Sequence, residues 1–164
     1  MNPFFTQNNL GQVPQPIDSE NLENPALPNA SQSEGTQLEI EDIIEPTILR
    51  YFETLNAGNF AATAQLFAIA GSMKPPFDAL IVGSEAIVHY LQAEATGMTL
   101  KPQRGTSQLQ DNGCIEVNVI GKVQTAFFEV NVTWKFLLNP LKEIDWVKIN
   151  LIASPQELLR LRRV

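Results

Sequence analysis

The stretch that most constrains the fold is GKVQTAFFEVNVTWKFLLNP, residues 121–140, where bulky apolar side chains occupy every second position in its second half. Successive side chains of a β-strand point to opposite faces of the sheet, so this spacing predicts a long strand with one apolar face. That face carries Phe128, Val130, Val132, Trp134, Phe136 and Leu138. It must either pack under helices or line a cavity.

Three further runs have the composition of strands, at about 99–109, 115–125 and 144–153, and the stretch above supplies a strand at 127–138. The sequence QDNGC lies between the first two runs, and Asn-Gly at such a place predicts a type I′ β-hairpin. Because the runs follow one another closely, we expect an antiparallel meander.

Helical patterns precede these strands. Apolar residues at three- and four-residue spacings predict an amphipathic helix from Leu38 that closes at Gly58. Asn59 is placed to cap a short second helix that reaches Phe67, and Ser84 is placed to cap a third. Helices followed by a sheet indicate an α+β fold, with a curved antiparallel sheet wrapped around the helices as a cone open at one end.

The two ends of the chain have patterns of their own. Residues 1–37 contain no Lys or Arg and five prolines, so we expect a flexible acidic tail before a single domain at 38–164. The sequence SPQELLRLRR near the end has a capping serine, a proline at the first helical position and a glutamate that completes a capping box. A short C-terminal helix is therefore expected.

Composition excludes several classes of function. A net charge of -7 argues against nucleic acid as a partner, because phosphate binding depends on clustered Lys and Arg. With His89 and Cys114 as the single residues of their types, metal centres and catalytic triads are hard to build. No apolar run is long enough for a membrane span and no signal peptide is evident, so we expect a cytoplasmic protein. Cys114 either forms an intermolecular disulfide or has no role.

Two segments, RYFETLNAGNFAATAQLFA and PPFDALIVGSEAIVHYLQAEA, resemble the opening of the nuclear-transport-factor-2-like superfamily, which includes isomerases, dehydratases and non-enzymatic binding proteins. Its ketosteroid-isomerase-like members carry a catalytic aspartate where this chain has Pro75, which cannot accept a proton. Tyr51 matches the oxyanion-hole tyrosine of those enzymes. A cavity enzyme of the isomerase or dehydratase kind remains the alternative, with Asp78 as its candidate acid or base.

The motifs PPFDALIVG, KPQRG, GKVQT, WKFLLNP and LIASPQELL resemble the C-terminal domain of the orange carotenoid protein, in particular the stand-alone homologues of that domain in cyanobacteria. The resemblance spans about residues 40–162. It implies a non-enzymatic protein that binds a ketocarotenoid such as canthaxanthin or echinenone. Tyr51 and Trp134 match the two residues that hold the ring carbonyl, and both side chains are hydrogen-bond donors. The positions that contact ring or polyene are Leu55, Leu100, Val123 and Phe128, although apolar residues there would line any such cone.

The resemblance also implies partners. A carotenoid is longer than one cone, so we expect a homodimer that shares the pigment between two open ends. Further expectations are pigment transfer to a helical carotenoid protein, transient membrane contact during uptake, and photoprotection by quenching of singlet oxygen and other reactive oxygen species. Glu94 matches a carboxylate that contacts the helical domain, or is an ordinary solvated residue. A scaffold that uses the cone only to dimerise is the remaining alternative.

Overall fold

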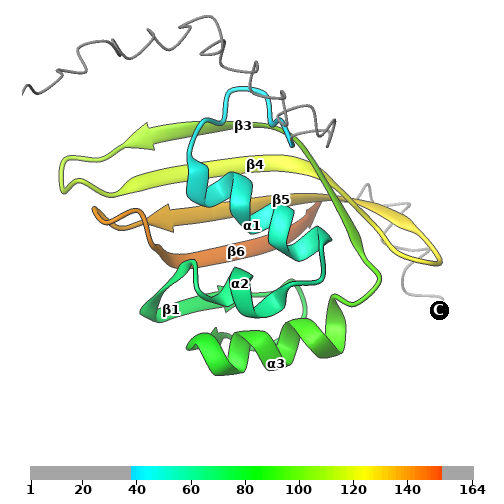
Figure 1. Ribbon diagram of the computed structural model, residues 1–164. Coiled ribbons are helices and arrows are strands. Elements are labelled where there is room, and N and C mark those ends of the chain that lie inside the picture. Colours follow the sequence, from blue (N-terminus) through cyan, green and yellow to red (C-terminus); the bar gives the residue numbers. More distant parts are fainter. Residues whose placement is uncertain (1–37, 153–164) are drawn as a thin grey trace, which may run out of the picture. The chain divides into compact units, whose positions relative to one another are not determined.

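The structure, a computed structural model, describes residues 38–152, so the predicted tail at 1–37 and C-terminal helix lie outside the described residues. Figure 1 shows the arrangement of its helices and strands. In chain order these are α1 Pro46–Asn56, α2 Phe60–Ala64, β1 Phe67–Lys74, β2 Ile81–Val82, α3 Ser84–Glu94, β3 Thr99–Leu109, β4 Ile115–Gln124, β5 Glu129–Leu138 and β6 Ile144–Ile152.

The strands form one curved sheet in the order β2-β1-β6-β5-β4-β3, with the helices on one side of it (Figure 1). The predicted α+β class with a curved sheet around N-terminal helices is confirmed. The meander is confirmed for β3 to β6, whose neighbours pair antiparallel. The sequence did not predict β1 and β2: β1 lies parallel to β6 and pairs antiparallel only with the two-residue β2.

The first helix begins eight residues later than predicted, at Pro46 rather than Leu38. Before it, Ile40 and Ile43 pair across a turn in which Asp42 has a φ of 66°. The backbone N–H of Glu41 donates to the carbonyl of Gln103 at 3.1 Å, which draws this segment to the edge of β3. The apolar spacing therefore arose from two elements, a bridge and a helix, rather than from one helix.

Three other local predictions meet different outcomes. The cap by Asn59 is confirmed, since its Oδ1 accepts from the backbone N–H of Ala62 at 3.2 Å, but α2 ends at Ala64 and Phe67 opens β1. The third helix starts as expected, with Gly83 rather than Ser84 at the N-cap. The predicted hairpin between β3 and β4 forms, but its turn type is wrong. A type I′ turn needs positive φ at two central residues, and in the segment 110–114 Gly113 alone has it.

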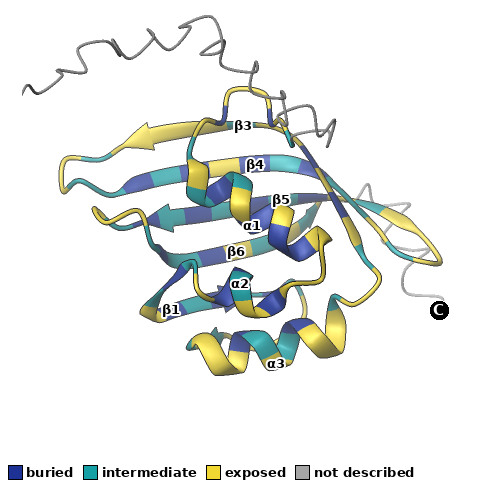
Figure 2. Ribbon diagram, in the orientation of Figure 1, coloured by how far each residue is buried: buried dark blue, intermediate teal, exposed yellow. Residues whose placement is uncertain are grey.

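The core lies between the concave face of the sheet and the helices, where buried positions of β4, β5 and β6 face α1 (Figure 2). The predicted alternation along β5 is confirmed from Val132 to Leu138, whose even-numbered members are fully buried. Phe128 differs: it precedes β5 and is 48% exposed, because the sheet has left the core at this point. One end of the apolar face thus opens toward solvent.

Candidate functional site

A cavity of about 640 Å³ lies under the helices, between α1, α3 and the concave side of the sheet. Its lining is mainly apolar and comes from two helices, five strands and three connecting segments. All six residues singled out from the sequence lie on its wall: Tyr51, Leu55, Leu100, Val123, Phe128 and Trp134. Residues more than eighty positions apart in the chain therefore face one space.

Tyr51 supplies a buried hydroxyl group to this cavity. Its side chain is 0% exposed, and its Oη has no hydrogen-bond partner. Burial, and to a smaller extent the nearby Tyr90, raises the pKa of the phenol well above its usual value, so Tyr51 stays protonated. An unpartnered O–H in an apolar cavity is a donor without an acceptor, and such a group costs free energy unless a ligand or water pairs with it.

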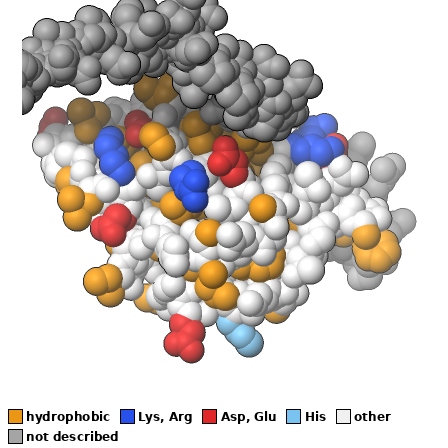
Figure 3. Space-filling view, viewed as in Figure 1, with side chains coloured by type: hydrophobic (Ala, Val, Ile, Leu, Met, Phe, Trp, Pro, Cys, Tyr) orange, Lys and Arg blue, Asp and Glu red, His pale blue; other side chains and the backbone are white. Residues whose placement is uncertain are grey.

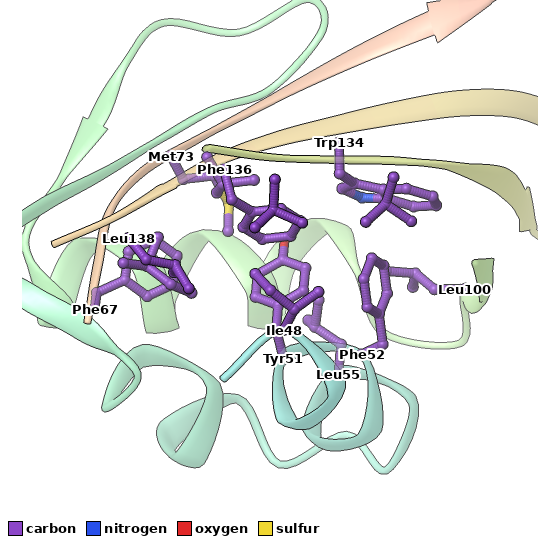
Figure 4. Close-up of a cluster of buried hydrophobic side chains, with 14 of the residues drawn as sticks. Ile48, Tyr51, Phe52, Leu55, Phe67, Met73, Leu100, Trp134, Phe136 and Leu138 are labelled. Atoms are coloured by element: carbon purple, nitrogen blue, oxygen red, sulfur yellow. The ribbon is translucent and has the colours of Figure 1, made fainter. Parts of the chain in front are cut away.

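The ring of Tyr51 is held by other aromatic rings. Figure 4 shows it standing between α1 and the sheet, beside Phe52 and below Phe136. The Tyr51 ring meets Phe136 edge to face at 5.0 Å between centroids and Phe52 at 5.2 Å. Edge-to-face packing on two sides fixes the ring and hence the hydroxyl position.

Trp134 comes from β5, where it pairs with Val119 of β4 and Ile149 of β6. It is 1% exposed, and its ring meets Phe52 edge to face at 4.9 Å. Phe52 therefore contacts both donor residues, a role that sequence reasoning missed. The signal was present, because a helical period places Phe52 close to the face of Tyr51 and Leu55.

The remaining wall is apolar. Leu55 and Leu100 are buried, and Asn56 fixes their relative position by accepting from the Leu100 N–H at 2.7 Å and donating to its carbonyl at 2.8 Å. This pair of hydrogen bonds ties the end of α1 to β3. Lining residues that the sequence did not single out include Met73, Met98, Ile149 and Leu151.

The mouth of the cavity is formed by the segment after β1, the end of α3 and the β4–β5 hairpin. Phe77 lines the cavity although its side chain is 81% exposed, and Pro75 lines it as a buried residue. Asp78, the candidate acid or base of the enzyme alternative, also lines the cavity, and its Oδ2 accepts from the Tyr90 hydroxyl at 2.9 Å. Polar groups thus stand at one side of the mouth.

On the face seen in Figure 3, positive and negative side chains of the described residues are interspersed and neither sign forms a continuous patch. Within residues 38–152, no cluster of His, Cys, Asp or Glu side chains could hold a metal ion. None of the helices found in this part of the chain is long and apolar enough to cross a bilayer.

A family model for the nuclear transport factor 2 (NTF2) domain matches residues 44–153. The orange carotenoid-binding protein of Limnospira maxima is 39% identical over 141 residues, which cover 84% of this chain and 44% of that protein. Its counterpart in Synechocystis sp. is 36% identical over 150 residues, 89% of this chain and 47% of that protein. The chain therefore spans about half the length of these curated relatives.

Among solved structures, the orange carotenoid protein of Anabaena (Nostoc) sp. PCC 7120, described as binding canthaxanthin, is similar with a TM-score of 0.69 and 42% sequence identity. The match covers 76% of this chain and 41% of that one. The similarity thus extends from sequence to the arrangement of helices and strands that builds the cavity.

Proposed function

Since this chain belongs to the nuclear transport factor 2 (NTF2) family and is a homologue of the C-terminal domain of the orange carotenoid-binding proteins, we propose that it binds a ketocarotenoid in its cavity. The terminal ring enters first, and its carbonyl oxygen accepts hydrogen bonds from the Tyr51 hydroxyl and the Trp134 indole N–H. Canthaxanthin and echinenone are suitable ligands. The pigment supplies the light absorption and the quenching chemistry, while the protein binds and orients the ring and excludes water.

The unpartnered hydroxyl of Tyr51 is the observation that carries this proposal. A ketone oxygen is an acceptor with no proton to donate, so it pairs with Tyr51 and Trp134 without competition. The cavity walls around them are apolar, as a ring that consists mainly of carbon and hydrogen requires. Leu55, Leu100, Val123 and Phe128 are the proposed contacts of the ring and the first part of the polyene.

The mouth supports a proposal about partners. Phe77, Phe127 and Phe128 are large apolar side chains that are 81%, 91% and 48% exposed. One cavity leaves much of a carotenoid in water at a large hydrophobic cost, so the outer half of the pigment needs a second protein surface. We propose a homodimer whose two mouths meet, and a helical carotenoid protein as the acceptor of the pigment. Uptake from a membrane would use the same exposed aromatic side chains.

In this proposal the protein acts in the cytoplasm, carries and transfers the pigment, and quenches reactive oxygen species when loaded. Catalysis is no part of the proposal. The alternative, a cavity enzyme of the isomerase or dehydratase kind, receives one supporting observation, since Asp78 lies on the wall of the cavity. Against it, Pro75 stands where the related isomerases carry their base, and Asp78 is an exposed residue whose carboxylate already accepts a hydrogen bond from Tyr90.

The proposal is tested by producing the protein in a host that makes ketocarotenoid and in one that does not. The expected result is a coloured protein from the first host only, with a red-shifted visible spectrum and a dimer on size exclusion. The double variant Tyr51→Phe with Trp134→Phe should lose most of the red shift. A colourless wild-type protein from the pigmented host would remove the proposal, and assays of Asp78 variants for isomerase or dehydratase activity would follow.

A further inference from the structure

The cavity has a second pair of polar side chains besides its two donors. Tyr90 of α3 and Asp78 of the segment between β1 and β2 both line it, and the Tyr90 hydroxyl donates to Asp78 Oδ2 at 2.9 Å. The segment that carries Asp78 is fixed in turn, because the Lys74 ammonium donates to the backbone carbonyls of Pro75 and Asp78. The pair is therefore held in place before any ligand arrives.

The directions of the hydrogen bonds decide what this pair can bind. A carboxylate can only accept, so the proton of the Tyr90 hydroxyl is committed to Asp78. What remains free is acceptor capacity, on the Tyr90 oxygen and on the other Asp78 oxygen. Tyr51 differs from Tyr90 in that its hydroxyl proton is not donated to any acceptor. The cavity therefore offers donors at its inner end and acceptors at Tyr90 and Asp78.

The two tyrosines are near enough to influence each other. Tyr90 raises the pKa of Tyr51 in addition to the effect of burial, and the pKa of Tyr90 is itself raised by burial, by its hydrogen bond to Asp78 and by nearby carboxylates. Both hydroxyl groups therefore stay protonated at neutral pH. Both tyrosines also line the same cavity, so a ring that fills it contacts both.

We propose that Tyr90 and Asp78 form a hydroxyl-accepting subsite, which selects ketocarotenoids whose terminal ring carries a hydroxyl group next to the carbonyl. This inference rests on the proposed function and specifies its ligand class. A 3-hydroxy-4-keto ring pairs its carbonyl with Tyr51 and Trp134 and donates its hydroxyl proton to the acceptor pair. A ring with a carbonyl alone leaves the acceptors to water, and the ligand gains one hydrogen bond fewer.

The test compares two pigments that differ in these hydroxyl groups. Canthaxanthin has 4-keto rings, and astaxanthin has 3-hydroxy-4-keto rings. Each is titrated into pigment-free protein from the same detergent, and Kd is read from the red shift in absorbance. For the wild type we expect about tenfold tighter binding of astaxanthin, the effect of one hydrogen bond to an acceptor pair that includes a carboxylate.

Two variants and a control isolate the subsite. Tyr90→Phe keeps the ring and removes the hydroxyl, and Asp78→Ala removes the carboxylate from an exposed position where folding is not at risk. Both should bring the Kd ratio of the two pigments near one, mainly through weaker astaxanthin binding. His89→Gln changes the neighbouring, exposed residue of α3 and should keep the wild-type ratio.

The outcomes separate the subsite from the proposed function. Equal affinities for the two pigments in the wild type, or an unchanged ratio in both Tyr90→Phe and Asp78→Ala, would overturn the subsite while pigment binding stands. Failure of the wild type to bind either pigment would overturn both. A ratio that falls in the two variants and persists in His89→Gln supports the subsite.

Discussion

The inner end of the cavity and its mouth use the same aromatic residue types in different ways. At the inner end, Tyr51, Phe52 and Trp134 are at most 1% exposed and pack edge to face. At the mouth, Phe77 is 81% exposed and Phe128 is 48% exposed. The inner end is therefore preorganised for a group of fixed shape, whereas the mouth can adapt to a chain or a partner that passes through it.

The two tyrosines of the chain make the same contrast. Tyr51 has a buried hydroxyl without a partner, whereas Tyr90 is a half-buried residue whose hydroxyl donates to Asp78 in an exposed hydrogen bond. The unpaired hydroxyl of Tyr51 therefore lowers the stability of the fold, whereas the Tyr90–Asp78 hydrogen bond raises it. The difference indicates that Tyr51 keeps a proton for a ligand, whereas Tyr90 and Asp78 are fixed by their own hydrogen bond and keep only acceptor capacity.

The largest expected effect is that of Phe52→Ala. This change removes the ring that contacts both Tyr51 and Trp134, and such a truncation in a core costs about 3–5 kcal/mol of unfolding free energy. Phe77→Ala is the matched control at the mouth and should change stability by less than about 0.5 kcal/mol, as is usual for exposed positions. Urea unfolding of both variants checks the contrast, and equal losses would contradict it.

The tyrosines should respond to the loss of their hydroxyl groups with opposite signs. Without pigment, Tyr51→Phe removes an unpaired buried group and should raise the free energy of unfolding by about 1 kcal/mol. Tyr90→Phe removes a hydrogen bond to a carboxylate and should lower it by about 1 kcal/mol. Thermal unfolding of the pigment-free proteins measures both. A loss of stability in Tyr51→Phe would show that its hydroxyl already has a partner.

Alkaline pH should lower the free energy of unfolding through both tyrosine hydroxyl groups. The pKa of each tyrosine is raised in the folded state, so the unfolded chain loses these protons first as pH rises past the ordinary tyrosine pKa of 10.0. The contribution of the two tyrosines to stability should therefore be constant below that pH and fall above it. Absorbance of tyrosinate should rise together with unfolding, and the Tyr51→Phe variant should show a shallower fall. Tyrosinate formation in the folded protein near the ordinary pKa would contradict this.

The smallest effect is expected beside the turn of the β4–β5 hairpin, at Glu129. Hydrogen bonds from Lys101 and Lys122 lower the pKa of Glu129, so this carboxylate stabilises the fold above its ordinary pKa, and the contribution disappears as pH falls into the acid range. Glu129 is exposed, and solvent screening keeps the contribution small. Glu129→Gln should flatten the acid limb of the stability curve slightly, which parallel pH titrations of unfolding can measure.

Local patterns predicted the part of the fold where neighbours in sequence are neighbours in space. The alternation in β3 to β6 and the short connections between them define the meander, and the parity of Trp134 follows directly. The parallel pairing of β1 with β6 could not be predicted in this way, because it joins segments more than seventy residues apart. The start of the first helix was predicted wrongly for a related reason. The spacing of Ile40 and Ile43 fits a helix as well as a turn that packs on β3.

The sequence likewise predicted some residues of the candidate site and not others. Tyr51 and Trp134 were identified from a resemblance together with their donor chemistry, and both line the cavity. Asp78 was singled out only as a candidate acid or base. Its pairing with Tyr90 and the ring contacts of Phe52 were missed, because they depend on which side chains of other segments these residues face. Sequence patterns specify faces of strands and helices, whereas contacts across the cavity emerge from tertiary packing.

The central claim is that Tyr51 and Trp134 donate hydrogen bonds to a carotenoid carbonyl. Infrared difference spectroscopy of the carbonyl stretch, on protein loaded with canthaxanthin, tests it most directly. We predict a band shifted to lower frequency relative to the pigment in an apolar solvent, with part of the shift lost in Tyr51→Phe and part in Trp134→Phe. A carbonyl band at the frequency of the free pigment in the wild type would contradict the account.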